Sequence, residues 1–116
     1  MSDEELLRYA AKAMEYVEPH SYRPKTNCLL WVGKESGAAT WRPFHDNAEA
    51  FEMMVKLGID VTFDDIEVQA FPPDGIGGFC EMVKENNDPY AATRRAIVRA
   101  AAEIGKVMTL RSCYDK

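Results

Sequence analysis

A chain of 116 residues, of which 47% are hydrophobic and 28% charged, is long enough for one globular domain and unlike a disordered chain. Its formal net charge of −5 repels nucleic-acid phosphates, so direct nucleic-acid binding is not expected. The acidic start, Met1 to Glu5, is unlike a signal peptide, and no apolar stretch has the length of a membrane span. We expect one cytoplasmic domain over 1–116 without a membrane segment.

Cysteine and histidine residues are few and widely spaced. The cysteines are Cys28, Cys80 and Cys113, and the histidines are His20 and His45. None of these pairs has the spacing of a CxxC or HxxxH ligand set, so we expect no metal site and no cofactor. Apolar neighbours predict that Cys28 and Cys80 are buried thiols.

The N-terminal third predicts a helix and a hairpin. Ser2 and Glu5 form a capping-box pattern, and apolar residues at helical spacing extend the expected helix over 3–17. After a polar turn, an apolar run at 28–32 and a return segment at 38–41 are expected to pair as two strands.

A second helix is marked at both ends. Asp46 with Glu49 is typical of a helix start, and Gly58 is typical of a helix end. The apolar stripe expected to face the core consists of Ala48, Phe51, Met54 and Val55.

Two further strands are expected at 66–70 and 79–83, where apolar and polar residues alternate. They are joined by a turn at 72–78 that contains two prolines and three glycines. The acidic run before them lacks the ligand spacing of a cation-binding loop and is interpreted as a solvated connection. This run consists of Asp60, Asp64, Asp65 and Glu67.

A third helix is expected from Pro89 to Lys106, capped by Asp88, with 107–116 as a frayed tail or short edge segment. Its small residues would let a sheet, a second helix or a second copy of the chain approach closely. They are Ala92, Ala96, Ala100 and Ala101, flanked by Ile97 and Ile104. The order of elements predicts an α+β fold, an α-β-α sandwich with helices packed on a mainly antiparallel sheet and a core over 3–106.

Two segments resemble a known family. The first is Trp41-Arg-Pro-Phe followed by the helix segment 48–58, and the second is the segment 88–98, which begins Asp-Pro-Tyr-Ala-Ala-Thr-Arg-Arg. Both resemble motifs of the NinX-like phage proteins, the phage ABA-sandwich domain family. The resemblance implies a phage or prophage protein in the cytoplasm of a bacterial host. It supplies no established activity and no catalytic residues.

Trp41, Arg42 and His45 form the first candidate site. They bring an aromatic ring, a cation and an imidazole to the N-terminus of the second helix, where free N–H groups attract anions. Exposure of all three around a cavity would favour a ligand pocket. Burial of Trp41 with Arg42 in solvent would instead assign these residues to the structure of the fold.

Arg94, Arg95 and Arg99 form the second candidate site, on the third helix. Arg95 and Arg99 are four residues apart and share a face, with Glu103 as the expected ion-pair partner. They form either a small patch for phosphate, an acidic protein or RNA, or the solvent side of an amphipathic helix. The second interpretation is favoured.

None of these patterns indicates catalysis, since the serines lack the context of a catalytic nucleophile. We therefore expect a small non-enzymatic phage or prophage accessory protein that binds a host or phage protein, with a host-takeover or anti-defence factor as the specific version. The alternative is a small-ligand or nucleotide-binding domain, or an enzyme, with a pocket near Arg42 and His45. A homodimer contact through the alanine-rich helix is a further hypothesis.

Overall fold

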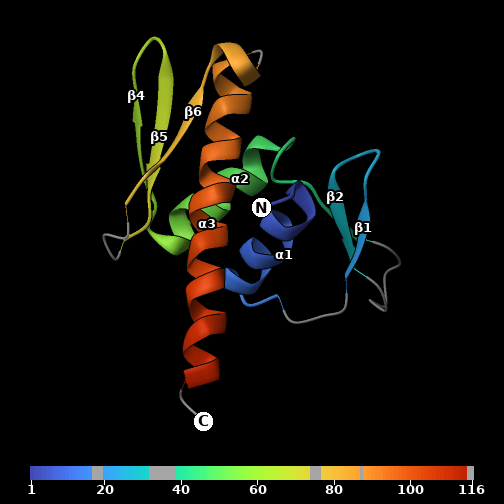
Figure 1. Ribbon diagram of the computed structural model, residues 1–116. Helices are drawn as coiled ribbons and strands as arrows, with labels where there is room; N and C mark the ends of the chain where they lie inside the picture. Colours follow the sequence, from blue (N-terminus) through green and yellow to red (C-terminus); the bar gives the residue numbers. More distant parts are fainter. Residues whose placement is uncertain (17–19, 32–38, 74–76, 87, 115–116) are drawn as a thin grey trace.

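The longest element is helix α3 (Pro89–Tyr114), and with α1 (Asp3–Ala13) and α2 (Asn47–Leu57) it lies between two small sheets (Figure 1). The computed structural model describes residues 1–16, 20–31, 39–73, 77–86 and 88–114. One antiparallel sheet contains β1 (His20–Arg23), β2 (Cys28–Trp31) and β3 (Ala39–Trp41) in that order. The other contains β4 (Asp60–Phe63), β5 (Glu67–Phe71) and β6 (Phe79–Met82), and is followed by a short 3-10 helix, η1 (Lys84–Asn86).

The predicted fold class is confirmed, because this is a single α+β domain of helices packed on antiparallel strands. The strands divide between two sheets, and each sheet gains a strand at a place where none was expected. β1 lies in the segment interpreted as a polar turn, and β4 lies in the acidic segment interpreted as a solvated connection. Both strands have four residues, β1 mainly polar and β4 with Val61 and Phe63 between acidic residues, and each pairs along its length with a strand that the sequence predicted, β2 or β5.

The core forms where α3 packs against α1 on one side and against β5 and β6 on another. Five alanines of α3 are fully buried, and their small side chains let α1 and the β5–β6 strands approach this helix closely. These alanines are Ala92, Ala96, Ala100, Ala101 and Ala102. The small-residue surface is therefore used within the chain, and a contact between copies would need another face.

The helix ends show which local signals hold. At α1 both hydrogen bonds of the Ser2–Glu5 capping box are present, but the helix ends at Ala13 rather than at residue 17, and Glu15 has a positive φ of 64°. Asp46 caps α2, and Gly58 ends it in the left-handed conformation with φ 68°. The boundaries expected for α2 are thus confirmed.

The expected end of α3 at residue 106 is wrong, because the helix continues to Tyr114. No proline or glycine follows Gly105 to stop it, and the side chains of Val107, Met108 and Thr109 remain partly buried. No helix in the described part of the chain is both long enough and apolar enough to cross a bilayer.

Of the two cysteines expected to be buried, only Cys28 is buried. Cys28 is buried as predicted, whereas Cys80 is exposed because β6 turns it to the outer face of its sheet. The Cys80 thiol donates a hydrogen bond to Oε2 of Glu67 at 2.7 Å, and this carboxylate raises the pKa of Cys80 to about 11. The side chain of Cys113 lies outside the described residues.

Candidate functional site

Helix α2 carries two apolar faces, and the one expected to be buried is the exposed one. Ala50 and Met53 pack in the core, whereas Phe51 and Val55 are 62% and 61% exposed. The predicted core stripe is therefore wrong for Ala48, Phe51 and Val55, whereas Met54 is partly buried and packs against the core as expected. Both faces satisfy a helical period, so periodicity alone does not say which of them meets α3.

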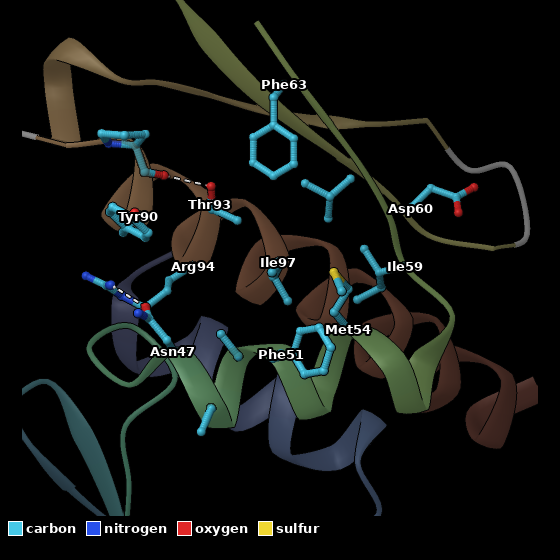
Figure 2. A pocket seen from close by; sticks show the side chains of 14 residues that line it. Asn47, Phe51, Met54, Ile59, Asp60, Phe63, Tyr90, Thr93, Arg94 and Ile97 are labelled. Carbon is cyan, nitrogen blue, oxygen red and sulfur yellow. Dashed lines mark hydrogen bonds between the residues drawn. The ribbon is translucent and has the colours of Figure 1, made fainter. Parts of the chain in front are cut away.

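The exposed face of α2 forms one wall of a groove of about 900 Å³ (Figure 2). The other walls are β4 and the first half of α3. The lining is mainly apolar, and each of the three elements contributes two large apolar side chains to it. They are Phe51 and Met54 from α2, Val61 and Phe63 from β4, and Tyr90 and Ile97 from α3.

Three aromatic rings around this groove reach into solvent. Phe51 is 62% exposed, Phe63 66% and Tyr90 67%. Ile66, expected on a buried strand face, is also exposed, at the turn between β4 and β5. Large apolar side chains gathered on one face are characteristic of an interaction surface.

The polar groups at one end of the groove are held by contacts inside the chain. Arg94 donates from Nε to the carbonyl oxygen of Phe44 at 2.6 Å and from Nη1 to Oδ1 of Asn47 at 2.7 Å. The Thr93 hydroxyl donates to the carbonyl oxygen of Pro89 at 2.7 Å. Arg94 therefore joins α3 to the start of α2 and shapes the end of the groove.

The other two arginines of the candidate patch form ion pairs away from this groove. Arg95 contacts Asp3 at 2.7 Å and Arg99 contacts Glu81 at 2.6 Å, so their partners are these acids and not Glu103. The Arg95 hydrogen bond lowers the pKa of Asp3, and Asp3 in turn raises the pKa of Arg95. These contacts tie α3 to α1 and β6, which is a structural role.

In the described part of the chain, the first candidate set, Trp41, Arg42 and His45, divides between the core and the surface. Trp41 is 5% exposed in the core and meets the Tyr16 ring edge-on, with 5.6 Å between ring centroids. Arg42 and His45 are exposed, and none of the three lines the groove. This arrangement favours a structural role for Trp41, and ligand binding by Arg42 and His45 stays a prediction.

The groove residues on β4 were not identified from the sequence, because the acidic residues of this segment led to its interpretation as a solvated connection. The missed signal was the alternation of Val61 and Phe63 with polar neighbours, which is a strand pattern with one apolar face. Tyr90 was noted only as part of a helix start. A groove assembled from three elements is visible only after these elements have been placed.

Comparisons of this chain with protein-family models, curated protein sequences and solved structures find no match. Within the described ranges, no three His, Cys, Asp or Glu side chains are grouped closely enough to hold a metal ion.

Proposed function

We propose that this chain is a small non-enzymatic accessory protein that binds another protein through the groove between α2, β4 and α3. The observation that carries the proposal is an apolar groove lined by three exposed aromatic side chains, those of Phe51, Phe63 and Tyr90. Burial of such side chains against a partner is favourable by roughly 25 cal/mol per Å² of apolar surface. Aromatic residues and methionine are also enriched in protein–protein interfaces.

A polypeptide partner fits this groove better than a small metabolite. Small-ligand sites enclose most of the ligand and orient it with convergent polar groups. Here the rings lie at an open rim, and Arg94 and Thr93 already use polar atoms in contacts within the chain. The groove therefore offers apolar area and shape, which suit partner side chains.

The cellular setting comes from the sequence resemblance to NinX-like phage proteins. On that basis the partner is a host or phage protein, and a host-takeover or anti-defence role is the specific version of the proposal. The neighbouring arginines are paired within the chain, so they do not define a competing docking patch.

The proposal is tested by selecting binders from a random linear peptide library displayed on phage, with the biotinylated protein as bait. The groove variant carries Phe51→Glu and Phe63→Glu, both at exposed positions. The matched control is Leu110→Glu, because Leu110 is a 50% exposed apolar residue outside the groove. Circular dichroism and thermal unfolding establish that all three proteins are folded.

We expect enriched peptides that bind the wild type and the Leu110→Glu control equally, and the groove variant at least about tenfold more weakly, a difference of about 1.4 kcal/mol. Selection without enrichment, or peptides that bind the groove variant as well as the wild type, would contradict the proposal.

A further inference from the structure

We infer that the partner segment binds as an added β-strand along the free edge of β4, with the pattern basic–apolar–any–apolar–basic. This inference rests on the proposed function and specifies how the partner is recognised. It combines three observations: an unpaired strand edge, an apolar groove beneath that edge, and carboxylates at both ends of the strand.

The outer edge of β4 has unpaired backbone groups. The Asp64 N–H donates to the Glu67 carbonyl oxygen at 3.0 Å. Hydrogen-bonded pairs alternate along an antiparallel ladder, so the backbone groups of Thr62 also point toward β5, and those of Val61 and Phe63 point away from it. β4 is the terminal strand of its sheet, and no described residue pairs with that outer side. Val61 and Phe63 can therefore pair with a strand from outside.

The side chains of the same two residues face the groove. Val61 and Phe63 both line it, and Figure 2 shows the Phe63 ring across the groove from Phe51 and Met54 of α2. Successive side chains of an added strand alternate between the sheet faces, so two of them, separated by one residue, would lie beside Val61 and Phe63. These two side chains would be apolar and would cover the exposed Phe51 ring.

The carboxylates determine the charge of the partner. Asp60 and Asp64 flank the pair Val61 and Phe63, and in Figure 2 the Asp60 carboxylate points away from the Phe51 and Phe63 rings. Asp64 accepts the N–H groups of Ile66 and Glu67, which hold its pKa below the usual range and keep it ionised. Opposite charges on neighbouring strands are stabilising, so basic residues are expected at both ends of the partner motif.

A second copy of the chain fits this edge less well than a basic segment. Two β4 strands paired antiparallel about Thr62 would place Val61 beside Phe63, which is favourable. The same register would place Asp60 directly opposite Asp64 in both halves of the pair, and like charges in that position are destabilising. The charge pattern therefore selects a different chain with lysine or arginine at these sites.

The test uses a synthetic peptide, acetyl-Gly-Gly-Lys-Val-Thr-Val-Lys-Gly-Gly-amide, with the ¹⁵N-labelled full chain. The first readout is saturable change in amide chemical shifts, and the second is hydrogen exchange of individual β4 amides. We expect exchange at Val61 and Phe63 to slow several-fold with peptide, while exchange at Thr62, already directed toward β5, changes little. The peptide with glutamate in place of both lysines should bind about tenfold more weakly.

A charge exchange provides the matched control. Asp60→Lys should weaken binding of the Lys/Lys peptide and strengthen binding of a peptide with one lysine changed to glutamate. Residue 60 begins β4, so an antiparallel partner strand places its C-terminal charged residue beside it, and a parallel strand its N-terminal one. If the Asp60→Lys variant prefers Lys-Val-Thr-Val-Glu, the added strand is antiparallel. If it prefers Glu-Val-Thr-Val-Lys, the added strand is parallel. Equal binding of all charge patterns would overturn the inference.

The two proposals fail in different ways. If library-selected peptides require Phe51 and Phe63 but the alternating protection of β4 amides is absent, strand addition is wrong and groove binding stands. No saturable shift with the Lys/Lys peptide, when selected peptides do bind, would overturn the motif. If neither kind of peptide depends on the groove, the proposed function itself is wrong. Sedimentation showing a dimer that Phe63→Lys dissociates would replace the foreign strand with a second copy.

Discussion

Gly105 in α3 lies directly against the backbone of Tyr9 in α1, so that a β-carbon at position 105 would come within 1.8 Å of the Tyr9 carbonyl oxygen. Backbone cannot move aside as a flexible side chain can, and the two helices would have to separate. Close contact between α1 and α3 thus depends on this glycine.

The first prediction is that Gly105→Ala lowers the free energy of unfolding by about 1–3 kcal/mol, although alanine is intrinsically the better helix former. Urea unfolding followed by circular dichroism measures the change. Lys106→Ala, at the exposed neighbouring position, should change stability by less than about 0.5 kcal/mol. Equal stability of the Gly105→Ala variant and the wild type would contradict the contact.

The second prediction concerns Asp3 and Arg95, which join α1 to α3 at 2.7 Å. Arg95 lowers the native pKa of Asp3 below the ordinary aspartate value of 3.8, so the stabilisation is present above that value and is lost as pH falls through the native pKa. Asp3→Asn should cost about 1 kcal/mol at pH 7, and the wild type and the variant should converge in acid.

The control for this pair is Glu4→Gln, which removes another acid of the first turn, one paired with Arg8 and not with Arg95. It should cost less than about 0.5 kcal/mol. Thermal unfolding between pH 2 and 7 measures both variants. A constant difference between Asp3→Asn and the wild type across this range would show that the ion pair is not its source.

The third prediction is that Cys80 is exposed yet slow to react. Glu67 raises the pKa of Cys80 from the ordinary cysteine value of 9.0 to about 11, which makes the thiolate about 100-fold scarcer at pH 8. The more basic thiolate is more nucleophilic, which leaves a net decrease of about tenfold. Glu67→Gln should therefore speed alkylation by iodoacetamide about tenfold, as followed by mass spectrometry of the Cys80 peptide. Glu85→Gln is the control, and equal rates in all three proteins would refute the role of Glu67.

The fourth prediction distinguishes the two apolar faces of α2. Met53 is fully buried, so Met53→Ala should cost about 2–5 kcal/mol. Phe51 is mostly exposed, so Phe51→Ala should change stability by less than about 0.5 kcal/mol. Chemical denaturation of both variants measures this difference. A larger loss for Phe51→Ala would place the core on the other face.

Local signals predicted much of the fold because they act within a few residues. The capping box of Ser2 and Glu5, the cap at Asp46 and the left-handed Gly58 all lie where the sequence indicated them. β4 is different, because a short acidic segment becomes a strand only through its pairing with β5. The alternation of Val61 and Phe63 with polar residues was its only local signal, and four residues are too few for that signal to outweigh the surrounding acids.

The candidate site was harder to predict because it depends on contacts between distant segments. Arg95 was recognised as a cation, but its partner Asp3 lies 92 residues away in the chain. Phe51 was recognised as apolar, but whether it is core or surface depends on which face of α2 meets α3. The groove could not be predicted for both reasons: its walls come from three segments distant in the sequence, and its lining depends on which face of α2 is exposed.

The most direct test of the central claim is chemical-shift mapping of the ¹⁵N-labelled protein with a library-selected peptide. Docking in the groove predicts that the largest changes cluster at α2, β4 and the first turns of α3, including Phe51, Val61 and Tyr90. It also predicts that Arg42 and His45 remain unchanged. Largest changes around Arg42 and His45, or along the α3 surface beyond Gly105, would contradict the account.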